Sequence, residues 1–390
     1  MKKKIVYFTF HNWESKRQGG FHKFAEYSVK NGYETIFFSY PRNFWAFFKN
    51  SETFNYRTII KQISGIDFRY KNSILSNKTI ISIGLPIPVR FVHYFPSGLL
   101  NFFERITIPS FKKYAKLNFS DTPYFVFEST SSVLLLDTIK DLFPKSKIIY
   151  RPSDPLVAFK YGKRLKKYEF NMLAKADIVF LVNKKGYNLY KKQFPYFDEK
   201  VNFKILSNGV DVNLYQKQYP KPIELKIPNT ALYVGARPID WNMILDSAKL
   251  AKHINFIIVC PLSIPISFRK KYQLLKNLYY IKGIDRELVP NWVTNADVII
   301  VPNPRNWYKS RPWGVTAKYY QAIAAKKPII SYHDIDELEK LNISVTYDTK
   351  SFVSQLSKAI KNKTTNYCID LKEKDWNRIS NIFHDEIESL

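Results

Sequence analysis

Short runs of apolar residues alternate with amphipathic stretches along this chain, and this pattern limits its fold more than any other feature. Such alternation is typical of β-strands joined by crossover helices, which build parallel sheets. In the first half we predict strands at residues 5–10, 34–39, 79–83, 124–128, 147–150, 178–182 and 202–206. In the second half we predict them at residues 231–234, 255–259, 278–281, 298–301 and 328–332. The pattern therefore indicates an α/β fold.

The length indicates two domains, because 390 residues exceed what one hydrophobic core supports well. We place the boundary within Asn208–Asp211, ahead of a linker rich in Pro and Lys at Tyr215–Pro228. The stretch Lys372–Leu390 carries apolar residues at helical spacing, which predicts a helix that could cap the second domain. The predicted domains are residues 1–210 together with 373–390, and residues 211–372.

The charge of the chain favours anionic partners. Lys and Arg number 61 against 33 Asp and Glu, which gives a formal net charge of +28. Such a field suits nucleic acid, phosphorylated substrates or an acidic bilayer surface. The basic residues are spread along the chain and form no recognisable nucleic-acid motif, so we expect no nucleic-acid partner.

One segment, Leu85–Lys116, combines aromatic residues such as Phe102 and Phe103 with cations such as Arg90, Arg105 and Lys112. This mixture suits the headgroup layer of an anionic membrane, although a buried core helix is also aromatic. Arg42–Lys49 has a similar composition. We predict contact with the membrane surface through the first segment.

The sequence also allows predictions of the cellular location and of the cofactors. The apolar run in residues 1–10 is too short for a signal peptide, and no stretch approaches the roughly 20 apolar residues of a membrane-spanning helix. We expect a cytoplasmic protein, peripheral at the inner face of the cell membrane. Cys260 and Cys368 cannot build a disulfide framework, and neither a zinc spacing nor a convincing Asp-x-Asp motif is present. We therefore expect no metal and no cofactor.

The segment Gly314–Ile330 carries the most specific chemistry. Helical spacing places Lys318 and Gln321 on one face and leaves Tyr319, Ile323 and Ala324 free to pack. A lysine in the first turn of a helix that follows a strand suits a nucleotide diphosphate, since the helix N-terminus adds partial positive charge. The alternative is an ordinary core unit in which Lys318 lies on a solvated face.

Further residues follow predicted strands and could reach a ligand. Gly19, Gly20 and His22 follow the first strand, where the glycines would allow close approach of a ligand or only a tight turn. The loop Asn303–Trp313 carries Arg305, Lys309 and Arg311, which could bind a sugar carboxylate or lie in solvent.

Asp154 is the first candidate for a general base, because a carboxylate after a strand could take a proton from an acceptor hydroxyl. An N-cap for a helix that begins near Leu156 is the alternative role of Asp154. Glu128 is the second candidate base, and His11 or His22 could also serve.

The segment around Lys318 resembles the nucleotide-sugar site of glycosyltransferases with two Rossmann-like domains, the GT-B fold. The family pattern P-x(n)-K-x-x-E-Y-x-A-x-G-K-P-I reads here Pro312, Lys318, Gln321, Ala324, Lys326, Lys327 and Pro328. Gln321 stands where most of these enzymes carry Glu, and Lys326 where most carry Gly. The glutamine resembles the xanthan-type glucuronosyltransferases, the GumK-like family, which is an inverting branch. A second motif, Leu206–Asp211, sits at the usual interdomain position.

This resemblance implies an architecture and a set of roles. It implies two Rossmann-like domains facing a cleft, the first binding the acceptor and the second the nucleotide sugar, with a C-terminal helix that crosses back to the first domain. Lys318 would contact the donor phosphate, and Gln321 would contact the nucleoside. The other donor-binding candidates are Gly235, Arg237, Gly283 and Tyr319. Asp154 would lie in an Arg-x-Ser-Asp loop similar to that of the xanthan-type branch.

The sequence therefore predicts an inverting glycosyltransferase. Its best-supported reaction moves glucuronic acid from UDP-glucuronate to a lipid-linked oligosaccharide in exopolysaccharide or capsule synthesis. A retaining GT-B enzyme is the first alternative. A non-enzymatic protein that binds nucleic acid or an anionic surface is the second.

Overall fold

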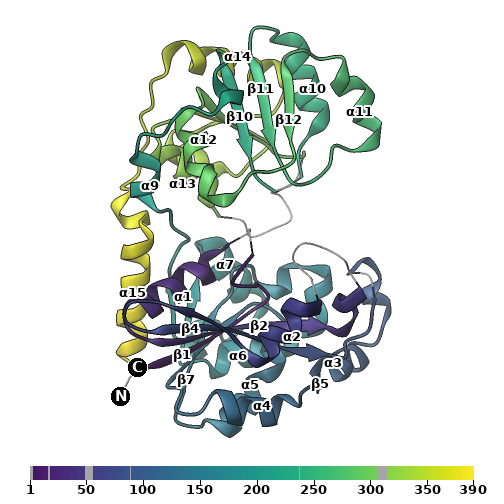
Figure 1. The fold of residues 1–390 in the computed structure, drawn as a ribbon, viewed down its shortest axis with the longest axis vertical. Helices are drawn as coiled ribbons and strands as arrows, with labels where there is room; N and C mark the ends of the chain where they lie inside the picture. Colours follow the sequence, from purple (N-terminus) through teal and green to yellow (C-terminus); the bar gives the residue numbers. More distant parts are fainter. Residues whose placement is uncertain (1–2, 16–17, 49–55, 88, 237, 306–313) are drawn as a thin grey trace. The chain divides into compact units, whose positions relative to one another are not determined.

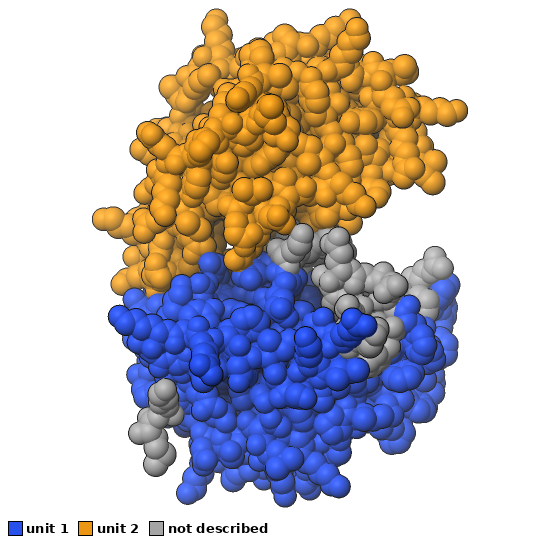
Figure 2. Space-filling view, viewed as in Figure 1, with its two compact units in different colours: residues 1–207, 380–390 blue, residues 208–379 orange. Residues whose placement is uncertain are grey.

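The computed structural model describes the chain except for residues 1–2, 16–17, 49–55, 88, 237 and 306–313 (Figure 1). It divides into two compact units, residues 1–207 with 380–390 and residues 208–379 (Figure 2). The first unit therefore ends after Ser207, where we predicted residue 210, and resumes at Ser380, where we predicted residue 373. Each unit has its own sheet and is described by itself below.

The first unit is built on one sheet, which has nine strands in the described part of the chain. Its order is β3-β4-β2-β1-β6-β7-β8-β9, and β5 pairs with β4. Pairing is parallel except where β3 and β5 run antiparallel to β4. The bounds are β1 Lys4–Thr9, β2 Glu34–Asn43, β3 Ile66–Arg69, β4 Ile74–Ser82, β5 Thr107–Ile108, β6 Tyr124–Glu128, β7 Lys147–Arg151, β8 Ile178–Leu181 and β9 Phe203–Ile205.

Helices cover both faces of this sheet, so its central strands are apolar throughout. One face packs against α4, α5, α6 and α7, and the other against α1. Stacked rings such as Phe8 and Phe127, with centroids 4.5 Å apart, fill the first face. The bounds are α1 Gly20–Lys30, α2 Tyr56–Ser64, α3 Ser97–Arg105, α4 Phe111–Asn118, α5 Leu136–Leu142, α6 Lys166–Lys175, α7 Lys184–Gln193 and α8 Phe197–Lys200.

The second unit is a smaller parallel sheet with the order β12-β11-β10-β13-β14-β15. Helices α10 and α14 pack on one face, and α9, α12 and α13 on the other. The strands are β10 Thr230–Val234, β11 Asn255–Val259, β12 Leu278–Ile281, β13 Val298–Pro302, β14 Ile329–Tyr332 and β15 Ser344–Thr346. The helices are α9 Val212–Gln216, α10 Trp241–Leu250, α11 Ile266–Gln273, α12 Val289–Asn295, α13 Ala317–Ala324 and α14 Thr349–Asn362.

The predicted strands are confirmed, because an observed strand overlaps each predicted range. The sequence did not predict β3, β5 or β15. These strands have two to four residues and lie at or beside the sheet edges, and β3 is partly exposed along its length. Short edge strands bury little apolar surface, so they leave only a weak pattern in the sequence.

The C-terminal helix α15, Trp376–Glu388, ends on the first unit, as the resemblance implied. Phe383 packs between Phe24 of α1 and Phe180 of β8, with ring centroids 4.5 and 5.0 Å away. Polar contacts follow on either side, since Tyr33 donates a hydrogen bond to Glu388 and Lys3 lies 2.8 Å from the same carboxylate. The alternative, a helix that caps the second domain with its C-terminal half, is wrong.

The boundary motif Leu206–Asp211 has a structural role within the second unit. Val210 pairs with the backbone just before α15, accepting from Trp376 N at 3.1 Å and donating to Lys374 O at 2.8 Å. A Cβ atom at Gly209 would lie 2.7 Å from both Lys374 O and Ile379 Cδ1. Only glycine allows this close approach of the two segments.

His384 makes the attachment of α15 sensitive to pH. Its Nε2 lies 3.0 Å from Ser28 Oγ, which also donates to Phe24 O, so the ring nitrogen is the donor. Its Nδ1 is buried without a hydrogen-bond partner among the described residues. Burial lowers the pKa of His384 to about 4, and the nearby Glu388 carboxylate opposes this only in part.

We predict that stability falls as the pH drops from about 6.5 toward 4, because the unfolded state takes up a proton that the folded ring rejects. Urea unfolding measures the free energy of unfolding at pH 7 and at pH 4.5. Between these two pH values, the wild type should lose on the order of 2 kcal/mol more of this free energy than His384→Gln does. Equal losses in the two proteins would contradict this role of His384.

Candidate active site

Each sheet has one place where the strand order reverses, between β1 and β6 in the first unit and between β10 and β13 in the second. Loops that leave the carboxyl ends of such strands diverge, and ligands of open α/β sheets bind there. Glu128 ends β6, and His11 follows β1. Gly235 follows β10. Three of the predicted site residues, Glu128, His11 and Gly235, therefore fall at the two positions where the topology favours a ligand.

Glu128 connects three loops at the carboxyl edge of the first sheet. Its Oε2 accepts from Thr9 Oγ1 at 2.5 Å, and its Oε1 accepts from Ser153 Oγ at 2.8 Å. His11 Nε2 lies 3.9 Å from the same Oε1. The Glu128 residue is only 2% exposed. A carboxylate this enclosed is better suited to hold its neighbours in place than to accept a proton from a substrate.

Arg151 supplies positive charge near this carboxylate. It is the partner of Glu128 in the β6–β7 register and is fully buried, with its guanidinium 4.9 Å from the centroid of the Phe24 ring. Burial lowers the pKa of Arg151 to about 10, and the negative charge of Glu128 opposes that shift. The two charges compensate each other in a region with little solvent.

Asp154 lies in the loop after β7 and is partly exposed. Its backbone N–H donates to Ser129 Oγ at 3.3 Å, which holds it beside the end of β6. The helical turn that follows, Leu156–Ala158, has Pro155 as its N-cap residue, and no side-chain cap is made at that position. The interpretation of Asp154 as a helix cap is therefore wrong.

Glu169 of α6 takes the capping role instead. Its Oε1 accepts from Leu156 N at 2.9 Å and its Oε2 from Val157 N at 3.0 Å. The hydroxyls of Tyr150 and Tyr190 donate to Oε1 at 2.8 and 2.6 Å. Burial raises the pKa of Glu169, and these hydrogen bonds oppose the shift. The Glu169 carboxylate thus anchors the loop that carries Asp154, and the sequence analysis did not identify this residue.

His22 supports the first loop from inside. It is fully buried; Gly19 N donates to its Nδ1 at 3.2 Å, so the proton is on Nε2, which donates to Asn12 O at 3.0 Å. We predicted His22 as a cleft residue or base, but both nitrogens are engaged with the backbone. Gly19 and Gly20 are partly exposed, and a Cβ atom at Gly19 would lie 3.4 Å from His11 Nε2.

In the second unit, Lys318 extends from the first turn of α13 to the end of β10. Its Nζ lies 4.5 Å from the centroid of the Tyr233 ring and 3.5 Å from the Tyr233 hydroxyl. A Cβ atom at Gly235 would lie 2.8 Å from that hydroxyl and 3.1 Å from Lys318 Nζ. Gly235 therefore leaves the lysine room beside the strand end, and the aromatic face holds the ammonium there.

The other residues of α13 divide as its spacing predicts. Tyr319, Ile323 and Ala324 are buried, whereas Lys318 and Gln321 are partly exposed. The Tyr319 hydroxyl lies 2.9 Å from Ser331 Oγ and also donates to Asp334. The structure thus places Tyr319, which we had included among the donor-binding residues, in the core.

The end of α13 shows how Lys326 fits the position where the GT-B pattern has Gly. Lys326 has φ +53°, and its N–H donates to Ile323 O while Lys327 N donates to Ala322 O, both at 2.9 Å. This is a Schellman turn, whose left-handed residue is usually glycine. Lys326 adopts the same backbone at some cost in strain.

The remaining predicted residues are placed as follows. Gly283 follows β12 with φ +84°, and Arg305 is exposed after β13. The predictions for Arg237, Lys309, Arg311 and Pro312 lie outside the described residues.

Thr316 is a residue that the sequence analysis missed. It is the N-cap of α13, and its Oγ1 is buried without a hydrogen-bond partner in the described part of the chain. A threonine before a helix is so common a cap that only the structure shows its hydroxyl unused. It is therefore available to a group bound at the N-terminus of α13.

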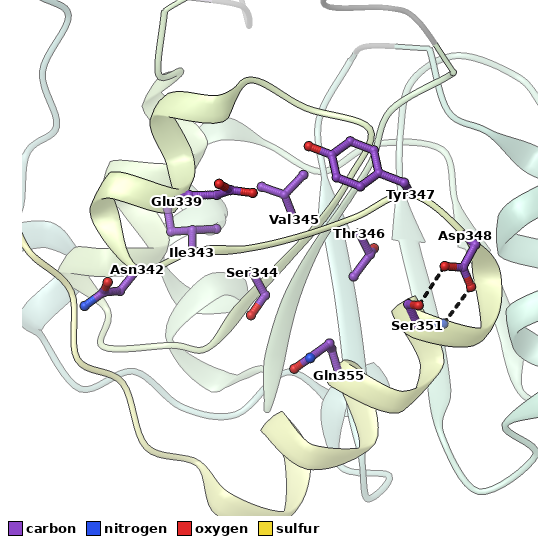
Figure 3. Close-up of a pocket in the computed structure, with 10 residues that line it drawn as sticks. All are labelled: Glu339, Asn342, Ile343, Ser344, Val345, Thr346, Tyr347, Asp348, Ser351 and Gln355. Carbon is purple, nitrogen blue, oxygen red and sulfur yellow. Dashed lines mark hydrogen bonds between the residues drawn. The ribbon is translucent and has the colours of Figure 1, made fainter.

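A separate cavity of about 520 Å³ lies over the edge strand β15 and the start of α14 (Figure 3). Its side chains are mainly polar. Asp348, at one end, caps α14 by accepting from Ser351 N at 2.8 Å and from Ser351 Oγ at 2.6 Å. None of the predicted site residues lines this cavity.

No group of three or more His, Cys, Asp or Glu side chains among the described residues could hold a metal ion. No helix in the described ranges is both long and apolar enough to cross a membrane.

Comparison with protein families matches residues 7–182 to the N-terminal domain of the glucuronosyltransferase GumK. That range contains His11, Glu128 and Asp154. No curated protein matches the chain.

Among solved structures, the chain is similar to the trehalose-6-phosphate protein from E. coli bound with UDP-2-fluoro glucose, with a TM-score of 0.63 and 12% identity over 100% of this chain and 99% of that chain. It is also similar to Anabaena Alr3699/HepE in complex with UDP-glucose, with a TM-score of 0.62 and 11% identity over 99% and 100%. For an α,α-trehalose-phosphate synthase (UDP-forming) from Burkholderia vietnamiensis, the TM-score is 0.61 and the identity 12%, over all of both chains.

These findings confirm three predictions. The structural likenesses confirm the GT-B fold, with its two Rossmann-like domains. The family match confirms the resemblance to GumK and the enzyme class, glycosyltransferase.

We predict that Glu169→Gln loosens the loop that carries Asp154. The backbone N–H groups of Leu156 and Val157 need one carboxylate oxygen each, and an amide leaves one of them facing another donor. The expected loss of stability is about 1–3 kcal/mol, measured by urea unfolding. A variant as stable as the wild type would show that the cap is dispensable.

Proposed function

We propose that this glycosyltransferase is an inverting enzyme that transfers a sugar from a UDP-sugar to a lipid-linked oligosaccharide in exopolysaccharide or capsule synthesis. The transferred sugar in this proposal is glucuronic acid. The observation that carries the proposal is the placement of Lys318 beside Gly235, at the start of α13. The family match to a glucuronosyltransferase domain supports the choice of sugar.

The donor half of the proposal rests on the second unit. Gly235 has no side chain that would keep a diphosphate from the end of β10, and Lys318 offers a full positive charge. The N-terminus of α13 and the unused Thr316 hydroxyl add donors to phosphate oxygens. Gln321, one turn further, would contact the nucleoside, and Gly283 would lie near its base. Similar structures that contain UDP-glucose or UDP support a uridine donor.

The acceptor half rests on the first unit. The Asp154 carboxylate would take the proton of the acceptor hydroxyl while its oxygen forms a bond to the anomeric carbon. The bond from that carbon to the diphosphate breaks in the same step, and Lys318 stabilises the charge on the departing UDP. Glu128 and Glu169 position the Asp154 loop through Ser153 and Leu156. The proposal includes no metal ion.

The lipid-linked acceptor requires contact with a membrane surface, and the first unit offers a suitable one. Exposed rings occur in the segments 44–48 and 89–105, where Phe48 is 71%, Tyr94 75% and Phe102 61% exposed. Rings of this kind enter the headgroup layer, and the net charge of +28 favours anionic lipid. We therefore propose a protein peripheral at the inner face of the cell membrane.

Retention of configuration is the principal alternative, since one similar structure concerns glycosyl transfer with retention. The anomer of the product, determined by NMR, decides between the two mechanisms.

We predict that Lys318→Ala weakens UDP binding by about 1.5–3 kcal/mol, because it removes a charge-assisted contact to phosphate. Isothermal titration measures this loss directly. Lys358→Ala, which removes an exposed lysine of α14, is the matched control and should bind UDP as the wild type does. Unchanged affinity in Lys318→Ala would mean that the donor site lies elsewhere.

We predict that Asp154→Asn lowers transfer at least about a hundredfold while UDP affinity stays the same, which is the scale of general-base catalysis. Glu128→Gln should be less damaging, because the amide oxygen can still accept a hydrogen bond from Ser153 or Thr9. Radiolabelled sugar transfer to a lipid-linked acceptor is the assay. If Glu128→Gln is inactive and Asp154→Asn is active, the base assignment is reversed.

A further inference from the structure

A cavity of about 340 Å³ opens beside α3 in the first unit. Gly98, Phe102 and Arg105 line it from one face of the helix, at i, i+4 and i+7. Ile106, just after the helix, and Tyr168 of α6 complete the lining. Apolar and aromatic groups thus form most of this wall, with one cation at its edge.

Residues of α3 outside the cavity lining attach the helix to the protein. Asn101 Nδ2 donates to Arg164 O at 3.1 Å, and Arg164 also pairs with Glu104. Leu100 and Asn101 are buried. These contacts hold α3 in place, so the shape of the cavity wall does not depend on a partner.

The charge of Arg105 is not neutralised by any described acidic residue in ion-pair contact. Its guanidinium is exposed and makes no hydrogen bond or ion pair with any described residue. The neighbouring acid, Glu104, is neutralised by Arg164. Tyr168 likewise has no hydrogen bond from its hydroxyl within the described ranges. A cation and a hydroxyl next to an apolar cavity match an anionic group attached to a hydrocarbon chain.

The surroundings of the cavity match a lipid in a bilayer. Leu99 is 45% and Phe102 61% exposed on α3, and Ile106 is 36% exposed. A helix that exposes such residues lies at the boundary between headgroups and acyl chains. A phospholipid in that layer presents its phosphate at the height of a cation and its chain just below.

We infer that this cavity binds one anionic phospholipid, with an acyl chain between Phe102, Ile106 and Tyr168 and the phosphate on Arg105. The inference rests on the proposed membrane contact and adds a defined site to it. A specific lipid would fix the orientation of α3 at the surface, which diffuse charge attraction alone does not do.

The chain offers a variant that fills the cavity. A Cβ atom at Gly98 would meet no heavy atom within 4 Å, and its φ is not in the left-handed region, so a larger side chain fits without strain. Gly98→Phe would place a ring in the space of the acyl chain. Ser97→Phe adds the same ring at a neighbouring exposed position outside the lining and is the matched control. Arg105→Gln tests the charge, with Lys113→Gln of α4 as its control.

The test uses the full chain and monomeric dihexanoyl phosphatidylglycerol, followed by titration calorimetry. We expect saturable binding of one molecule, weakened at least about tenfold in Gly98→Phe and in Arg105→Gln, which corresponds to about 1.4 kcal/mol. Both controls should bind as the wild type does. Dihexanoyl phosphatidylcholine should bind more weakly than phosphatidylglycerol, and inorganic phosphate should not bind.

Three results would overturn the inference. They are unchanged binding in a folded Gly98→Phe, equal binding of the two phospholipids, or tighter binding of farnesyl phosphate, which would assign the cavity to a prenyl carrier. Vesicles of phosphatidylglycerol separate this test from the proposed function. Vesicle binding without saturable lipid binding refutes the cavity alone, whereas lipid binding without vesicle binding refutes the membrane contact.

Discussion

The structure depends on parallel strands that are covered by helices on both faces. Because such strands have no solvated face, their loops alone carry the polar chemistry, and parallel pairing brings the carboxyl ends to one edge. One hydrogen-bonded group joins Glu128 to Thr9 and Ser153. Thr9 is 119 residues away from Glu128 in the sequence. The group around Glu128, the second candidate base, is therefore formed by sheet topology and not by any local motif.

Buried charge in the first unit is used to hold loops in position. Glu169 accepts from two backbone N–H groups and two tyrosine hydroxyls, so its burial leaves no oxygen unsatisfied. Glu128 and Arg151 compensate each other at the end of neighbouring strands. These groups prepare a rigid edge on which a partly exposed Asp154 can act, because mobile loops would misplace a proton acceptor.

In the second unit, the ammonium group of Lys318 lies next to a strand end and is held there by an aromatic ring. Tyr233 offers the face of its ring to Lys318, and Gly235 leaves the space open. An aromatic partner keeps the ammonium charge available to phosphate, whereas a carboxylate would neutralise it. In the first unit, the buried His22 and Thr9 have a different role, because each makes a hydrogen bond that supports a loop at the carboxyl edge of the sheet.

Residue type and spacing were enough to predict the central strands, the two-domain order and the exposed face of α13, because burial on both faces of a sheet and helical periodicity leave a direct pattern of apolar residues. The roles of individual polar residues became clear from the three-dimensional contacts alone. Asp154 precedes a helical turn and looks like its cap, but Glu169 from α6 satisfies that turn. Tyr319 adjoins Lys318 in sequence, but its hydroxyl binds Asp334 in the core. Hydrogen bonds between distant segments depend on which strands pair in the sheet. The local sequence around a polar residue does not encode that pairing.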